Sequence, residues 1–121
     1  MPRTPSLRDR ALQSRDAIEL LSSKWRIPVL HLLTSRPLRT GELQNAIADI
    51  SPKVLTQTLR GMERDGLISR TVHSVVPARV DYSLTAMGAS VLKPLQGLCH
   101  WARAHVRQRD QARAQFDIAQ P

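Results

Sequence analysis

The chain has 121 residues and a formal charge of +8, with 18 Lys and Arg against 10 Asp and Glu. This length suits a single domain over residues 1–121. The longest uncharged run is far shorter than the ~20 apolar residues of a membrane span, and the N-terminal segment lacks the apolar stretch of a signal peptide. We therefore expect a cytoplasmic protein without membrane contact, and the single cysteine agrees with a reducing compartment. The positive charge is spread along the chain and favours an anionic partner, most often nucleic acid.

The apolar residues predict a lean core. Only four residues are aromatic, namely Trp25, Tyr82, Trp101 and Phe116, so the core must consist of Leu, Val, Ile and Ala. A small core of this kind often needs a partner subunit. We therefore expect a homodimer.

Two helices are predicted near the N-terminus. Residues 1–6 contain two prolines and are expected to be disordered, as are residues 114–121. Apolar residues at helical spacing then predict a first helix over about 7–22. Ser22 and Ser23 are candidate caps for a second helix, which should end before Arg36-Pro37.

A helix-turn-helix is predicted next. Thr40 is a candidate N-cap for a short third helix, and Asp49-Ile50 is expected to form a turn. Ser51-Pro52 then gives a specific helix start, with a serine at the N-cap and a proline at the first helical position. Asp65-Gly66 should end this fourth helix. Two helices joined by a short turn make a helix-turn-helix.

After Gly66 the period of the apolar residues changes. Two short strands rich in β-branched residues are predicted, joined by a loop over 74–79. Thr85 should cap one long terminal helix over about 85–110. The predicted fold class is mainly α with a small β-hairpin, a winged helix-turn-helix whose DNA-binding core spans 40–84 and whose N- and C-terminal helices serve dimerisation.

Several local strings resemble the HxlR-type bacterial regulators. They are Ser23-Lys24-Trp25, the ISPKVLTQ string from Ile50 to Gln57, the DGLI string from Asp65, the VPARVDYSLT string from Val76, and Leu98-Cys99. The resemblance covers about residues 12–106. It implies a DNA-binding dimer whose first and last helices pair between subunits and which responds to a small molecule or to oxidative stress. Many thiol-sensing members have a cysteine at the position of Leu12, so sensing by that thiol is excluded here.

The fourth helix carries the main candidates for DNA contact. If it buries Leu55, Leu59 and Met62, its polar side chains must project from other faces. Lys and Arg suit guanine edges, Gln suits adenine, and Thr suits a phosphate or a thymine methyl group. The candidates are Lys53, Thr56, Gln57 and Arg60, with Ser51 at the start of the helix. The alternative is an ordinary solvated helix face.

Further candidates for DNA contact flank this helix. Arg79 ends the loop of the hairpin, where it can reach a minor groove or a phosphate. The alternative for Arg79 is an ion pair with Asp81. Arg39 and Thr40, with Arg36 before them, lie where a helix start suits a phosphate, and an ordinary solvated surface remains open for them.

Apolar residues of the two terminal helices are candidates for the dimer interface. They are Leu7, Ala11, Ile18, Val91, Leu95, Leu98, Ala102 and Val106. Trp25 and Trp101 are candidates for an effector pocket, although core or interface packing is the more ordinary role for them. Cys99 lies between apolar residues, and we expect it to be buried and inert.

The sequence contains no pattern typical of a catalytic or metal-binding site. The four histidines lack the i, i+4 spacing of paired metal ligands, and the chain has no phosphate loop or nucleophile elbow. We therefore expect no enzyme, no cofactor and no metal. The hypothesis is a sequence-specific DNA-binding transcriptional regulator, a ligand-responsive repressor that acts as a homodimer on an inverted-repeat operator in double-stranded DNA. The alternative is a winged-helix module that binds protein or RNA without sequence-specific DNA binding.

Overall fold

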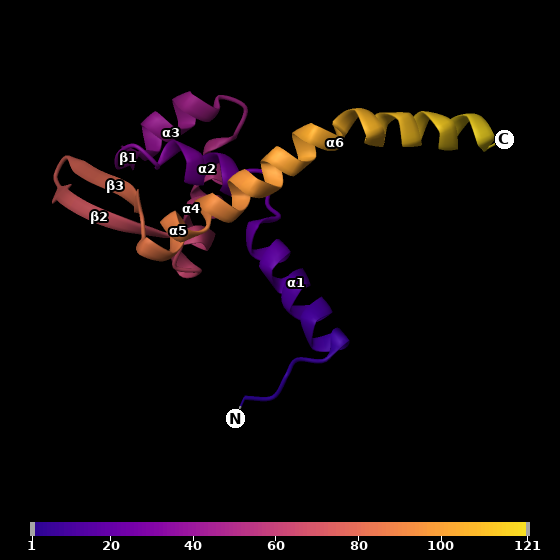
Figure 1. The fold of residues 1–121 in the computed structure, drawn as a ribbon. Coiled ribbons are helices and arrows are strands. Elements are labelled where there is room, and N and C mark those ends of the chain that lie inside the picture. The colour runs from indigo at the N-terminus through magenta and orange to yellow at the C-terminus, as the bar shows by residue number, and fades with distance from the viewer. Residues whose placement is uncertain (1, 121) are drawn as a thin grey trace. The chain divides into compact units, whose positions relative to one another are not determined.

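The computed structural model describes residues 2–120, which form two compact units, one up to Ala89 and one from Ser90. The first unit contains, in chain order, α1 (Leu7–Leu21), α2 (Arg26–Leu32), β1 (Leu38–Arg39), α3 (Thr40–Ile47), α4 (Pro52–Arg64), β2 (Ile68–Val75) and β3 (Ala78–Leu84) (Figure 1). Helix α5 (Ala86–Ser90) ends at the boundary, and the second unit consists of α6 (Leu92–Ala119). Within residues 2–120, no helix combines the length and apolar character that crossing a membrane requires.

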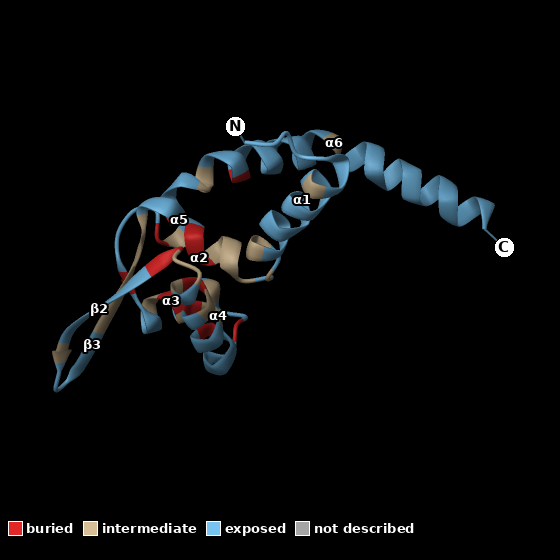
Figure 2. Cartoon of the chain, turned by 90° about the horizontal axis from the view of Figure 1, so that it is seen from below, coloured by how far each residue is buried: buried red, intermediate tan, exposed pale blue. Residues whose placement is uncertain are grey.

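The strands form one antiparallel sheet in the order β1-β3-β2. The core of the first unit lies where α2, α3 and α4 meet the inner end of this sheet, whereas the outer end of the hairpin is exposed (Figure 2). The buried side chains among residues 2–89 are all apolar and none is aromatic: Val29, Leu30, Leu33, Leu38, Leu43, Ile50, Leu55, Leu59, Met62, Leu67 and Ile68. The predicted fold class is confirmed by this arrangement.

The predicted first helix is confirmed as α1. The Ser6 hydroxyl accepts a hydrogen bond from the Asp9 backbone N–H at 3.0 Å, and the Asp9 carboxylate accepts one from the Ser6 N–H at 3.1 Å. This reciprocal pair is a capping box, which stabilises the first turn. No residue of α1 is buried.

The predicted starts of the next two helices were wrong by a few residues. Helix α2 begins after Trp25, so Ser22 and Ser23 are not its caps, and the Ser22 hydroxyl instead donates to the Glu19 carbonyl at the end of α1. Thr40 is the first residue of α3 and not its N-cap. Glu42 has the capping role there, because its carboxylate accepts from the Arg39 N–H at 3.1 Å.

Helix α4 begins and ends as its sequence predicts. The Ser51 hydroxyl accepts from the Val54 N–H at 3.2 Å, and Pro52 follows at the first helical position. At the other end, Gly66 has a φ of 78° and donates to the Glu63 carbonyl, while Leu67 donates to the Met62 carbonyl. These two bonds form a Schellman motif, which requires a residue that tolerates positive φ.

The hairpin and the terminal helix differ in part from expectation. The strands extend into the predicted loop, which leaves Val76 and Pro77 as the turn. The single helix predicted from Thr85 is wrong, because α5 and α6 are separated at Val91. Pro94 explains the separation, since its ring has no N–H to continue an existing helix but is accepted in a first turn.

The C-terminal end also needs a correction. Residues 114–119 are helical instead of disordered, in agreement with their Ala, Arg and Gln content. Met1 and Pro121, which were part of the expected disordered ends, lie outside the described residues.

Candidate nucleic-acid interface

Helix α4 separates apolar and polar side chains onto two faces. Leu55, Leu59 and Met62 are at most 1% exposed and attach the helix to the core. The polar candidates on the other side are all exposed: Lys53, Thr56, Gln57 and Arg60. Ser51 is exposed as well, but its hydroxyl caps the helix and so sets where the exposed face begins.

The turn between α3 and α4 holds the two helices of the helix-turn-helix together. Ala48 has a φ of 65°, and the Asp49 N–H donates to the Ile47 carbonyl at 2.7 Å, which closes a three-residue γ-turn. The Gln44 side-chain amide donates to the Ile50 carbonyl across the turn. The sequence indicated a turn here, but nothing in it indicated a positive φ at an alanine.

Arg79 is exposed at the start of β3, and it makes no ion pair with any of residues 2–120. The alternative of an Arg79–Asp81 ion pair is not found. Asp81 instead lies 3.8 Å from the Arg39 Nε atom and 2.8 Å from the His73 Nε2 atom. The guanidinium of Arg79 is therefore available to an external anion.

Arg36 and Arg39 are partly neutralised by carboxylates. The Arg36 Nη2 atom lies 2.8 Å from the Glu42 Oε2 atom, and this hydrogen bond raises the pKa of Arg36 and lowers the pKa of Glu42. Thr40 is exposed beside them. Arg36 and Arg39 line a hollow of about 460 Å³ together with Arg79 of the hairpin. Its lining residues are Arg36, Pro37, Arg39, Glu42, Arg79 and Asp81.

A second hollow lies between α4 and the hairpin and was not anticipated from the sequence. It measures about 500 Å³, and we call it the helix–strand groove; its lining residues are Thr56, Arg60, Glu63, Arg64, Arg70 and Tyr82. Arg70 on β2 lies opposite Tyr82 on β3. The available signal was the position of Arg70 two residues after buried Ile68, on the strand face where an apolar residue is expected.

The candidate interface residues of the two terminal helices are mostly exposed in the single chain. Leu7 and Ile18 of α1 are 78% and 67% exposed, and Leu98 of α6 is 60% exposed. Ala11, Ala102 and Val106 are exposed, Val91 is half-buried and Leu95 is buried. Cys99 is exposed, so the expectation of a buried thiol was wrong. The reason is that Cys99 lies on a helix of which only Leu95 is buried.

The two tryptophans belong to different units. Trp25 is half-buried, with the Lys24 Nζ atom 4.8 Å from its ring centroid. Trp101 is exposed and stacks on His105 at a centroid distance of 4.8 Å. Their role in an effector pocket stays a prediction.

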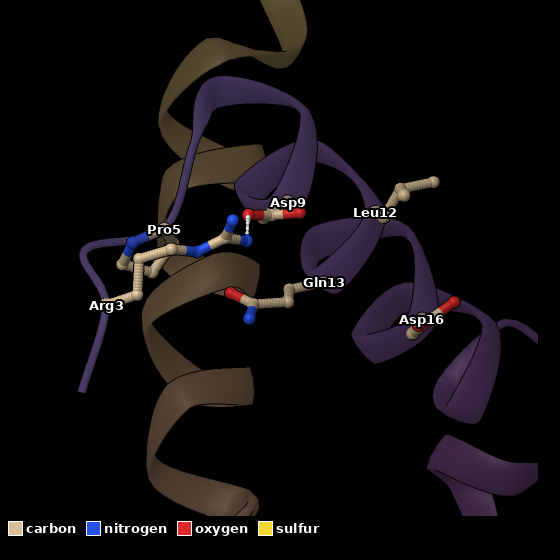
Figure 3. A pocket seen from close by; sticks show the side chains of 6 residues that line it. All are labelled: Arg3, Pro5, Asp9, Leu12, Gln13 and Asp16. Atoms are coloured by element: carbon tan, nitrogen blue, oxygen red, sulfur yellow. Dashed lines mark hydrogen bonds and ion pairs between the residues drawn. The ribbon is translucent and has the colours of Figure 1, made fainter.

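A shallow hollow lies beside the start of α1 (Figure 3). The Arg3 Nη2 atom and the Asp9 Oδ2 atom form an ion pair there at 2.9 Å, and Leu12 points away from that pair. The described residues contain no group of three or more His, Cys, Asp or Glu side chains placed to hold a metal ion.

Comparison with known proteins identifies the family. Residues 20–110 match the family model of the HxlR-like helix-turn-helix. The HTH-type transcriptional regulator YkvN of Bacillus subtilis is 41% identical over 103 residues, which cover 85% of this chain and 86% of that protein.

Solved structures of transcriptional regulators share the fold of this chain. A regulator of the MarR family from Enterococcus faecalis V583 has a TM-score of 0.76 at 31% identity, over 90% of this chain and 99% of that one. Quinone-bound YodB from B. subtilis has a TM-score of 0.67 at 28% identity, over 76% of this chain and 97% of that one. Because the relatives are transcriptional regulators, a non-enzymatic role is implied. The chain therefore belongs to the HxlR-like helix-turn-helix family and is a transcriptional regulator of the winged-helix type.

Proposed function

We propose that the protein is a ligand-responsive repressor that binds an inverted-repeat operator as a homodimer. One observation carries the proposal for DNA recognition: the exposed polar face of α4 lies in the same unit as an exposed Arg79 on the hairpin, which pairs with no acidic side chain of residues 2–120. A recognition helix reads base edges in the major groove, and a wing reaches the adjacent minor groove or phosphates. In this proposal, Lys53 and Gln57 read bases, whereas Arg79 contacts the backbone. Thr56, Arg60, Arg39 and Thr40 add contacts to phosphates or bases.

The proposed dimer uses apolar residues of α1 and of the segment from Val91 through α6, most of which are exposed in the single chain. We call Val91, Leu95, Leu98, Ala102 and Val106 the α6 seam: Val91 directly precedes α6, and the other four residues follow it along the helix at spacings of four and three. An exposed apolar surface of this kind marks an association site. Two-fold symmetry then places the two recognition helices on an inverted repeat.

A small-molecule effector is supported by the quinone bound to the related YodB structure. The family resemblance places Leu12 where many thiol-sensing members have a cysteine, so a response through a thiol at that position is excluded for this chain. We propose that Trp25 and Trp101 contribute to the effector site, since aromatic side chains commonly line such sites.

The experiment that tests DNA recognition compares Gln57→Ala and Arg79→Ala with the wild type. Binding to the intergenic DNA upstream of the gene and to scrambled DNA is measured over a range of salt concentrations. Gln57→Ala should cost about 1–3 kcal/mol on the operator and less on scrambled DNA. Arg79→Ala should weaken binding to both DNAs evenly and reduce the salt slope by about one unit.

The matched control is Gln111→Ala, which removes an exposed glutamine from α6 and should change neither binding curve. Circular dichroism checks that each variant is folded. Equal losses on both DNAs for Gln57→Ala would refute base reading by α4. Wild-type binding to protein or RNA without preference for the operator would support the alternative of an interaction module.

A further inference from the structure

We propose that the helix–strand groove is a second phosphate-binding site for the DNA backbone, and that Glu63 competes with the phosphate for Arg70. The inference rests on the proposed function, because it presupposes that DNA lies along α4. It adds Arg64 and Arg70 to the contacts proposed for the exposed face of α4 and for Arg79, and it assigns an opposing role to an acidic residue.

The groove brings three arginines together from two elements. Arg60 and Arg64 are one turn apart on α4, and Arg70 comes from β2. Guanidinium groups match the geometry of phosphate oxygens with paired N–H donors. Tyr82, opposite Arg70 on β3, adds a phenolic hydroxyl that can donate to the same oxygens. Because Arg60 also belongs to the exposed polar face of α4, the groove continues that face toward the hairpin.

The position of Arg70 in the sheet is unusual. Ile68 and Arg70 point to the same side of β2, because side chains on a strand alternate. Ile68 is 2% exposed, whereas the Arg70 side chain is 50% exposed. The core therefore ends between these two positions, and the arginine begins the exposed part of the hairpin.

A charge on an edge strand can also serve only to block strand addition, and β2 is an edge strand. A charge that only blocks strand addition needs no side-chain partner on the face of the sheet. Arg70 instead faces a carboxylate and lines a hollow with two other arginines, which favours anion binding.

Glu63 holds Arg70 only loosely. The Arg70 Nε atom and the Glu63 Oε2 atom are 3.8 Å apart, and the side chains are 50% and 39% exposed. An exposed pair at this separation is weak. A backbone phosphate that accepts two short hydrogen bonds from one guanidinium can displace it. Glu63 thus lowers the affinity of the free protein for any DNA.

The test measures DNA affinity for Arg70→Ala, Glu63→Gln and the double variant, on operator and scrambled DNA over a range of salt. Arg70→Ala should reduce the salt slope by about one unit on both DNAs. Glu63→Gln should raise the affinity for both DNAs about twofold to fivefold at low salt. The double variant should bind like Arg70→Ala, because Glu63 acts through Arg70.

Three controls keep the outcome specific. Arg70→Lys should keep the wild-type slope, and it preserves the test if Arg70→Ala fails to fold. Arg103→Ala removes an equal charge from α6 and should leave the slope unchanged. In the third control, inorganic phosphate replaces chloride at equal ionic strength. If phosphate binds the wild type but not Arg70→Ala, while both proteins have the same salt slope for DNA binding, the groove is a site for free phosphate. That outcome would overturn the proposal.

Failure of this inference can be separated from failure of the proposed function. If the wild type does not prefer its operator, the proposed function fails. If Gln57→Ala loses operator preference as expected but Arg70→Ala keeps the wild-type slope, only the groove proposal fails. A full Glu63→Gln effect in the Arg70→Ala background would also overturn it, because Glu63 would then repel DNA without acting through Arg70.

Discussion

Ala48 holds a backbone conformation that L side chains rarely adopt, with a φ of 65° in the γ-turn before α4. Such strain costs on the order of 1–3 kcal/mol, of which glycine recovers a part at some cost in chain entropy. We expect Ala48→Gly to raise the free energy of unfolding by about 0.5–1 kcal/mol. Ala46→Gly, on helical backbone in α3, should lower it by up to about 1 kcal/mol. Urea unfolding measures both, and destabilisation by Ala48→Gly would contradict the strained geometry.

Glu42 predicts a dependence of stability on pH. Its pKa is lowered, first by the hydrogen bond from Arg36 and then by the bond from the Arg39 N–H. A carboxylate whose pKa is lower in the folded state contributes stability above its unfolded pKa, and this contribution is lost as the pH falls through the folded pKa. The stability advantage of the wild type over Glu42→Gln should therefore be present at neutral pH and shrink below the ordinary carboxyl pKa of 4.5. Chemical unfolding from pH 7 to pH 3 checks this, and a pH-independent difference would exclude the ionised pair as its cause.

At the scale of single residues, the sequence predicted which side chains could contact DNA better than it predicted their burial and their partners. The exposed polar face of α4 followed from the spacing of its apolar residues. The exposure of Cys99, the loose pairing of Arg39 with Asp81 and the position of Arg70 did not follow, because each depends on which elements pack together. Spacing along one helix says nothing about whether a second element covers it.

At the scale of elements, α5 approaches the segment between α4 and β2 closely at Gly88. A Cβ atom at Gly88 would lie 1.9 Å from the Leu67 carbonyl oxygen. Thr85 fixes the same junction, because its hydroxyl accepts from the Gly88 N–H at 3.0 Å and donates to the Gly66 carbonyl. Position 88 of α5 therefore has no room for a larger residue.

Gly88→Ala should lower the free energy of unfolding by about 1–3 kcal/mol, because the backbone must shift to admit the methyl group. Gly97→Ala is the matched control on α6, where a Cβ atom meets nothing within 4 Å. That change should stabilise its helix by about 0.5–1 kcal/mol. Thermal unfolding of both variants tests the contrast, and equal tolerance of the two alanines would show that the junction is looser than described.

Among the elements, those with a local start signal were predicted best. Ser51-Pro52 and Gly66 fixed the ends of α4 to the residue. Strand β1 was missed, because two residues carry no periodic pattern and their pairing with β3 arises only in the folded sheet. The separation of α5 from α6 was missed because Pro94 is compatible both with a kinked long helix and with a new helix start.

At the scale of the whole molecule, the apolar residues of α1 and the α6 seam predict a dimer. Sedimentation velocity at micromolar concentration should show a dimer for the wild type. Leu98→Glu places a charge in the seam and should shift the protein toward the monomer. Ile118→Glu changes an apolar residue on the same helix that is 85% exposed and lies outside the seam, so it should leave the dimer intact. A folded wild-type monomer would contradict this prediction, as would equal effects of the two variants.

If the dimer is two-fold, the half-site centres of its operator should lie about 10 base pairs, or a multiple of that, apart.

Helix α1 has a capping box but no buried residue, and this combination determines how often the helix opens. A helix of 15 residues with only local stabilisation opens easily, because isolated helices of about 12–15 residues are marginal in water. Its amide hydrogens should exchange with deuterium much faster than those of α4, whose apolar side is buried. If a second chain covers α1, this exchange should slow as the protein concentration rises. The exchange rate of one helix would then report the fraction of chains that have found a partner.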